Sequence, residues 1–140
     1  MSPSQTTTTA PVLVPKDRRA TFLPELFGAN LLVYGETTLN SIMKGLSHED
    51  VCQDSWEFYE LDGAPLYIVP ASQPSYRLFN PQSGYDAEFT SGLAGIIITL
   101  AALSILAQQC HCEHVRRSHA RLYAFAMAHP KAAEIFAVID

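Results

Sequence analysis

Residues 92–109 read GLAGIIITLAALSILAQQ, and no side chain in this stretch is charged. Its leucines and isoleucines point in nearly every direction around a helix, which is typical of a helix buried on all sides. The unbroken run of small and apolar residues, 93–107, is shorter than the roughly 20 residues that a bilayer core needs. We therefore expect a buried core helix, capped by Thr90 or Ser91, and no membrane span.

Strands are predicted before this helix. Residues 56–61 and 66–69 are rich in aromatic and β-branched side chains and flank Asp62-Gly63-Ala64-Pro65, a turn sequence. This pattern predicts a hairpin whose loop is slightly longer than two residues. A second hairpin is predicted from residues 76–79, through a turn at 80–84, to residues 85–89. Four successive strands joined by short turns favour a single antiparallel meander.

Helical patterns lie on both sides of the strands, around residues 22–27, 36–46, 115–125 and 132–139. The resulting order predicts an α+β fold, in which a small antiparallel sheet of about four strands packs against the buried central helix and flanking N- and C-terminal helices. The first residues are rich in Ser, Thr and Pro, so we expect residues 1–16 to form a disordered tail and residues 17–140 a single domain.

Composition and net charge limit the cellular compartment and the binding partners that we expect for this protein. Three cysteines, an odd number, without an N-terminal targeting pattern indicate reduced thiols in the cytoplasm. The net charge is −5, and residues 36–62 hold seven acidic side chains against one lysine. The chain therefore offers no broad basic face, and we expect no direct binding to nucleic acid. The sequence leaves the oligomeric state open, a homodimer included.

Residues of the types that bind metals cluster after the predicted apolar helix, in and near the start of the next predicted helix: Cys110, His111, Cys112, Glu113, His114 and His119. Structural zinc sites pair ligands across two to four residues and need a second such pair, for which only His48 and Cys52 remain. A polar turn between helices explains the cluster better, so we expect no metal and no cofactor. A zinc- or thiol-dependent enzyme that uses the Cys110–His119 cluster remains the alternative.

Other catalytic patterns are missing from the sequence. It contains neither a Gly-x-Ser-x-Gly elbow nor a phosphate-binding loop, and Ser47-His48-Glu49 are consecutive, which scatters their side chains. The sequence therefore predicts a protein that is not an enzyme.

Several motifs, together with the helix at Leu100–Ala107 that follows one of them, resemble the ArdB/KlcA antirestriction family, and the resemblance extends over roughly residues 18–140. They are Arg19-Ala20-Thr21-Phe22-Leu23-Pro24-Glu25-Leu26-Phe27-Gly28, Trp56-Glu57-Phe58-Tyr59-Glu60-Leu61, Tyr67-Ile68-Val69-Pro70, Ser91-Gly92-Leu93-Ala94-Gly95-Ile96, His129-Pro130-Lys131-Ala132 and Ala137-Val138-Ile139-Asp140. The chain departs from the family pattern at Cys52-Gln53-Asp54-Ser55 and at the hairpin turn. The order and spacing of these motifs carry the resemblance.

The resemblance implies a protein of plasmids and other mobile elements that protects incoming DNA from host type I restriction enzymes. Its partner would be that restriction machinery, directly or indirectly. A mimic of duplex DNA must present one negative charge per about 1.7 Å of axis. Fourteen acidic residues offset by nine basic ones do not reach that density. We therefore expect interference without occupation of the enzyme's DNA groove.

Four residues are candidates for binding a partner. Trp56, Tyr59 and Asp62 lie in the acidic stretch, and large aromatic side chains are favoured anchors at interfaces. Trp56 also fits the protein core. Asp140 places a carboxylate at a helix C-terminus, where the helix dipole disfavours anions, although a frayed end would tolerate it.

Overall fold

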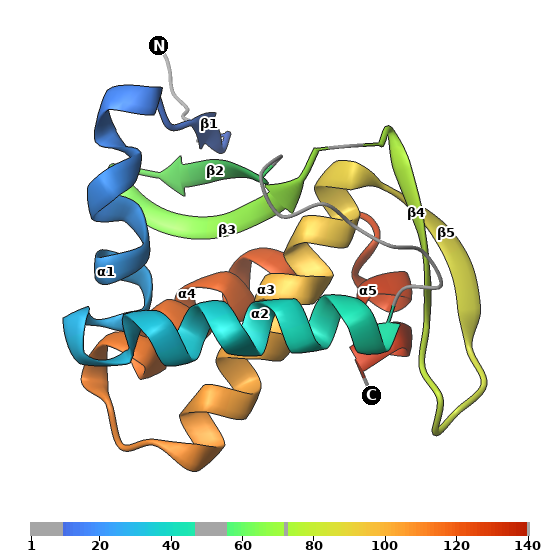
Figure 1. Cartoon of the computed structure of the whole chain (residues 1–140). Helices are drawn as coiled ribbons and strands as arrows, with labels where there is room; N and C mark the ends of the chain where they lie inside the picture. The colour runs from blue at the N-terminus through green and yellow to red at the C-terminus, as the bar shows by residue number, and fades with distance from the viewer. Residues whose placement is uncertain (1–9, 47–55, 72, 140) are drawn as a thin grey trace, which may run out of the picture.

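The computed structural model describes residues 10–46, 56–71 and 73–139. Its helices are the 3-10 segments η2 (Lys16–Thr21) and η3 (Ala29–Leu31), followed by α1 (Phe22–Phe27), α2 (Leu32–Leu46), α3 (Ser91–Gln109), α4 (Glu113–Met127) and α5 (Ala132–Ile139). Its strands are β1 (Val12–Leu13), β2 (Trp56–Leu61), β3 (Ala64–Pro70), β4 (Ser75–Phe79) and β5 (Asp86–Thr90). The α+β class expected from the sequence is confirmed (Figure 1).

Helix α3 runs through the centre of the molecule, with α2 and α4 crossing it and the two sheets beside it (Figure 1). Thr90 caps it, because its hydroxyl accepts a hydrogen bond from the amide of Leu93. By length and composition α3 could cross a membrane, but 56% of its most apolar window is buried inside the protein. It packs against β3, α2, α4 and α5. The expected core helix is confirmed.

The strands form two sheets, so the expected single meander is wrong. One sheet has the order β1-β2-β3 and the other pairs β4 with β5, and both are antiparallel. The chain leaves the first sheet after β3 because the outer edge of that strand is covered by α3. The hydroxyl of Thr99 accepts from the amide of Ile68 (3.1 Å) and donates to its carbonyl (3.3 Å). A side chain of α3 thus occupies the backbone positions that β4 would need.

Gly95 allows this approach of helix to strand. A Cβ atom at this position would lie 2.3 Å from the carbonyl oxygen of Ile68 and 2.9 Å from the Cα of Val69. Both are backbone atoms, which cannot rotate away as a flexible side chain can. The close contact also protects a sheet edge that would otherwise present unpaired backbone groups.

The turn between β2 and β3 is shorter than expected. It consists of Asp62 and Gly63 alone, since β3 already begins at Ala64. Both residues have positive φ, 54° and 78°. These values match the type I′ turn that two-residue hairpins favour, in which Asp and Gly are the usual residues.

The expected tail ends before residue 16. Val12 and Leu13 pair with Tyr59 and Glu60 of β2, and Val14 is buried. A strand of two residues, Val12 and Leu13, is too short to be predicted from a sequence pattern. It forms because its backbone pairs with β2. Residues 1–9 of that expected tail lie outside the described residues.

Polar contacts fix the ends of the shorter helices. The hydroxyl of Ser118 in α4 donates to the carbonyl of Leu26 near the end of α1 (2.7 Å). The side chain of Asn80, in the β4–β5 turn, donates to the carbonyl of Val138 in α5 (2.7 Å) and accepts from the amide of Gln82. These buried bonds join elements that are far apart in the sequence.

The contact at Gly95 gives the first prediction. Replacing Gly95 with alanine raises helix propensity by about 1 kcal/mol, but the new methyl group meets fixed backbone atoms of β3. We expect the destabilisation by this clash to exceed the gain in helix propensity, so that the free energy of unfolding falls by at least about 2 kcal/mol. Urea denaturation followed by circular dichroism measures it.

Gly92 provides the matched control in the same helix, because a Cβ there would meet nothing within 4 Å. Gly92→Ala should leave the stability unchanged or raise it slightly. Equal stabilities for the two variants would show that α3 does not approach β3 this closely.

Candidate interaction site

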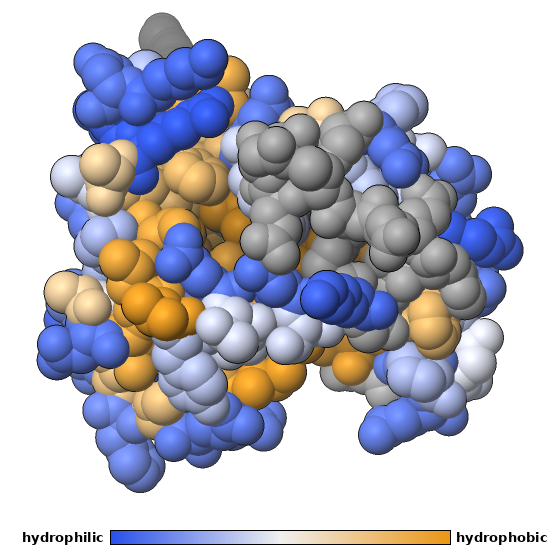
Figure 2. All heavy atoms as spheres, viewed as in Figure 1, coloured by the Kyte–Doolittle hydropathy of each residue, from blue (hydrophilic) through white to orange (hydrophobic). Residues whose placement is uncertain are grey.

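A cleft of about 280 Å³ opens between η2 and α1, helix α2, and one face of β2 and β3. On the face shown in Figure 2, hydrophobic atoms are visible at the bottom of a hollow between the sheet and α2, with hydrophilic side chains around it. The lining residues come from four segments: Arg19, Leu23, Glu36, Leu39, Asn40, Trp56, Phe58 and Ile68.

Aromatic stacking builds one wall of the cleft. The ring of Phe22 stacks on that of Phe58, with centroids 4.9 Å apart and an interplanar angle of 16°. Phe22 is buried, and its helix α1 packs against β3. The stack therefore fixes the N-terminal helical segment against the sheet and holds the cleft open between that segment and α2.

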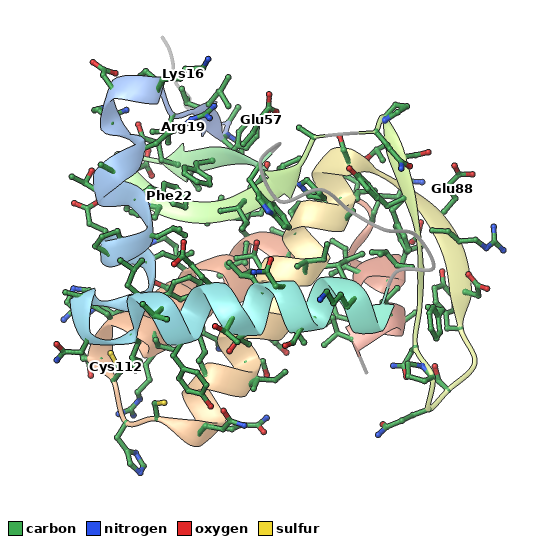
Figure 3. All side chains as sticks on the ribbon, in the orientation of Figure 1. Lys16, Arg19, Phe22, Glu57, Glu88 and Cys112 are labelled. Atoms are coloured by element: carbon green, nitrogen blue, oxygen red, sulfur yellow. The ribbon has the colours of Figure 1, made fainter. Side chains whose placement is uncertain are left out.

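Arg19 is the distinctive side chain of the cleft. Its guanidinium lies over the ring of Phe58, 5.5 Å from the centroid, and Figure 3 shows it close to β1 and β2. Its Nε atom is buried, and within the described part of the chain it has no hydrogen-bond acceptor. A buried donor without an acceptor costs about 1–3 kcal/mol. The fold therefore maintains one unsatisfied donor, within the described residues, in a cationic side chain that lines a partly apolar cleft.

The preceding arginine behaves differently. Arg18 makes a two-pronged ion pair with Glu60, with nitrogen–oxygen distances of 2.6 and 3.2 Å. Hydrogen bonds from Arg18 lower the pKa of the Glu60 carboxyl below its usual value. Arg18 thus has a partner within the protein, whereas Nε of Arg19 has none among the described residues.

The structure places only one of the predicted partner-binding residues in this cleft. Trp56 lines it and is half-buried, packed against the core. Tyr59 faces the other side of the sheet, where its ring stacks on Tyr67 at 5.4 Å. Burial and the neighbouring Glu57 carboxylate raise the pKa of Tyr59. The two aromatic candidates therefore lie on opposite faces of β2.

Asp62 and Asp140 do not join either face. Asp62 is exposed in the β2–β3 turn, where its positive φ accounts for the residue type without a partner. Asp140 lies outside the described residues. The four predicted residues thus do not form a single site in the part of the chain that the structure describes.

The cysteine and histidine cluster does not assemble a metal site among the described residues, where no three His, Cys, Asp or Glu side chains come together as metal ligands. The thiol of Cys112 lies 3.7 Å from the carbonyl oxygen of Phe27, at the end of α1 (Figure 3). The ring of His119 lies tilted against that of Tyr123, with centroids 5.8 Å apart, and burial lowers the pKa of His119. His48 and Cys52, the proposed second pair, lie outside the described residues.

Sequence reasoning did not select Arg19 as a site residue. The sequence shows two adjacent arginines, and only the fold reveals that Glu60 pairs with the first, while Nε of the second has no acceptor in the part of the chain that the structure describes. The available signal was the position of Arg19 at the start of a family-like motif. That motif and Trp56-Glu57-Phe58 form opposite sides of one cleft.

Comparison with known proteins decides the family. A model of the family described as "Antirestriction protein" matches residues 49–140. The chain belongs to this antirestriction family. The matched residues include the sheet side of the cleft, with Trp56, Phe58 and Ile68, and helices α3, α4 and α5.

Relatives of the antirestriction family extend the similarity over nearly the whole chain. The antirestriction protein KlcA of Escherichia coli is 31% identical over 133 residues, which cover 91% of this chain and 92% of KlcA. The uncharacterized protein YafX of Escherichia coli strain K12 is 30% identical over 138 residues, covering 91% of this chain and 85% of YafX. Both alignments span more of the chain than the family model does.

A solved structure confirms the fold of the antirestriction family here. It covers 98% of this chain and 99% of its own, with 27% identity and a TM-score of 0.76. It belongs to work on KlcA and ArdB, described as having a novel fold and antirestriction activity against type I DNA restriction systems in vivo but not in vitro.

The unsatisfied Arg19 gives the second prediction. In Arg19→Met the apolar stem is retained and the buried donor is removed, which relieves about 1–3 kcal/mol, while the lost cation–π contact costs about 0.5–1 kcal/mol. We expect stability in urea to be unchanged or higher. A loss of more than about 1 kcal/mol would mean that Arg19 already has a stabilising partner within the chain.

Proposed function

We propose that this chain counteracts host type I restriction–modification in the cytoplasm on behalf of a mobile element such as a plasmid, by binding a protein partner through the Arg19–Trp56 cleft. It does so without mimicking DNA and without enzymatic activity. Membership of the antirestriction family supports the biological role. The observation that carries the mechanism is the buried Nε of Arg19, which has no acceptor among the described residues, in a cleft that Trp56 also lines.

The distribution of charge supports a mechanism other than DNA mimicry. Four ion pairs among the described residues place basic groups beside acidic ones: Arg18–Glu60, Arg77–Asp86, Arg117–Glu113 and Lys131–Glu134. Where acidic and basic groups lie side by side in this way, the surface does not form the continuous negative stripe of a duplex. The same pairs balance the charge of three of the six arginines, which weakens a DNA-binding face as well.

The cleft has the composition of a protein contact. Arginine and tryptophan are the side chains most enriched among residues that dominate binding energy, and such residues lie in pockets that exclude water. Arg19 brings donors, Glu36 an acceptor and Asn40 both, so a partner's polar groups can be satisfied on entry. The apolar floor of Phe58, Leu39 and Ile68 suits an apolar anchor from the partner.

The described residues of the cleft lack the groups of a catalytic site. Among the lining residues that the structure describes there is no serine, cysteine or histidine, and Glu36 is the one carboxylate. General acid–base or nucleophilic chemistry needs at least two cooperating groups within hydrogen-bond reach. This composition supports binding in preference to catalysis.

Indirect interference with the restriction enzyme agrees with what is described for the structural relative, whose antirestriction activity was found in vivo but not in vitro. A protein that acts only inside cells needs a component that the purified system lacks. We therefore propose that the partner bound in the cleft is a host protein that controls or accompanies the type I enzyme.

Phage plating tests the role. Cells with type I restriction that express this chain should plate unmodified phage more efficiently than cells without it, and cells without restriction should show no difference. Arg19→Met should abolish most of that gain, since loss of a dominant contact costs about 2 kcal/mol or more in binding.

Arg18→Met is the control for this test. It removes the same charge at the neighbouring position, but its side chain lies outside the cleft and pairs with Glu60 in an exposed ion pair. It should retain antirestriction. Equal activity of the Arg19→Met variant and the unaltered chain, at equal protein levels, would contradict the role of the cleft.

A competition experiment tests the mechanism separately. Purified protein added in molar excess should leave a type I enzyme bound to fluorescently labelled DNA, because the surface does not reproduce the charge of a duplex. Stoichiometric displacement of DNA, weakening with salt as electrostatic competition does, would identify a groove-occupying decoy.

A further inference from the structure

A second cleft, of about 530 Å³, lies on the opposite face of the first sheet from the Arg19–Trp56 cleft. Adjacent residues of β3 separate the two, because Ile68 lines the first cleft and Tyr67 the second, and successive strand residues face opposite sides. Figure 1 shows the α4–α5 connection passing beside the start of α3. The lining residues are Pro11, Tyr67, Thr90, Gly92, Leu93, Ile96, Phe125, His129, Pro130 and Lys131.

The start of α3 supplies one free backbone donor to this cleft. The amide of Ser91 donates to the carbonyl of Pro74, and the amide of Leu93 donates to the hydroxyl of Thr90. Gly92 lies between them, where a helix provides no internal acceptor. A Cβ at Gly92 would meet nothing within 4 Å, so the backbone there is accessible. The N-terminal end of the 19-residue helix also carries partial positive charge.

Tyr67 supplies a second donor. The residue is 8% exposed, with its ring stacked on Tyr59 and tilted by 34° against Phe125. Its hydroxyl makes no hydrogen bond to any other described residue, and it is not one of the fully buried polar atoms, so solvent or a ligand can reach it. Burial raises the pKa of Tyr67 to about 12, so the hydroxyl remains protonated near neutral pH and can donate.

The α4–α5 connection completes the polar side of the cleft. The amide of Lys131 donates to Nδ1 of His129 (3.0 Å), which leaves the hydrogen of a neutral imidazole on Nε2 as another donor. The ammonium group of Lys131 lies 3.5 Å from the carboxylate of Glu134. The Glu134 carboxylate balances part of the positive charge of Lys131. The cleft therefore suits a ligand with one negative charge better than a ligand with two.

The remaining wall is apolar and consists of Leu93, Ile96 and Phe125. A cleft between about 300 and 1,000 Å³, mostly apolar with a few convergent polar groups, is typical of a small-molecule site. We propose that this cleft binds a small carboxylate with an apolar or aromatic body. The carboxylate accepts from the amide of Gly92 and the hydroxyl of Tyr67, and the body packs against Phe125 and the first turn of α3. This site is independent of the proposed role of the Arg19–Trp56 cleft.

An NMR titration of the full chain with 3-phenylpropionate tests the proposal. The amide resonances of glycines are readily resolved, and the chain has only seven of them. We expect saturable shifts of the Gly92 amide and of the Tyr67 and Phe125 resonances. The neutral analogue 3-phenylpropanamide, with the same shape, should bind at least about tenfold more weakly, because hydrogen bonds to a charged acceptor are the stronger ones.

Tyr67→Phe isolates the hydroxyl. Because that group has no partner in the described part of the protein, its removal should not lower stability in urea, yet affinity for 3-phenylpropionate should fall about tenfold or more. Tyr123→Phe is the control, since Tyr123 is exposed on α4 and packs against His119 and Phe136 outside the cleft. It should leave binding unchanged.

Four outcomes would overturn the proposal. Absence of any shift at Gly92 would exclude the site, and equal binding of the amide would leave an apolar hollow without an anion site. Saturation by inorganic phosphate at the same concentrations would show that the apolar body adds nothing and that the ligand class is wrong. A Tyr67→Phe variant that binds as well as the unaltered chain would remove the hydroxyl from the site.

Discussion

The whole structure depends on one close approach, between the backbone of β3 at Ile68 and the face of α3 that carries Gly95 and Thr99. The glycine removes the methyl group that would meet the Ile68 carbonyl at 2.3 Å, and the threonine hydroxyl satisfies both polar groups of that residue. Because the helix seals the strand edge, the first sheet stops at three strands and the chain must start a second one. The helix can do this only because it is apolar all round and can be covered by α2, α4 and α5 on its other sides.

This arrangement leaves two faces of one small sheet available for binding. On one face the N-terminal helical segment and α2 form the Arg19–Trp56 cleft, and on the other the start of α3 and the α4–α5 connection form a cleft around Tyr67. The first contains a buried donor, Nε of Arg19, that the described protein does not satisfy, and the second contains the accessible hydroxyl of Tyr67. A fold that retains an unsatisfied buried donor forgoes stability that an apolar replacement would provide, which is common where side chains are kept for binding. For a member of the antirestriction family, binding surfaces of this kind suit an action that operates through proteins and ligands in the cell.

Several features could be predicted because their causes are local. The absence of charge over residues 92–109 requires burial wherever the helix lies, and Thr90 is suited to cap it in any fold. The hairpins follow from alternating strands and turn residues. The errors concern features with distant causes: the strand at Val12–Leu13 exists because β2 is beside it, and the two-residue turn at Asp62 and Gly63 depends on β3 starting two residues earlier than its apolar run. Trp56 could be selected as a contact residue from its type, whereas the separation of Tyr59 onto the opposite face required the register of the strand.

The sequence by itself determined the class of fold, the central helix, and the lack of a duplex-like charge density, because each is a property of composition or of neighbouring residues. Only the tertiary structure decided how many sheets there are and which polar groups lack partners. Arg18 and Arg19 are chemically identical in the sequence, and they differ because Glu60, 42 residues away from Arg18, reaches one of them. Pairing and burial depend on contacts between distant segments, and the chain creates those contacts only when α3 closes against β3.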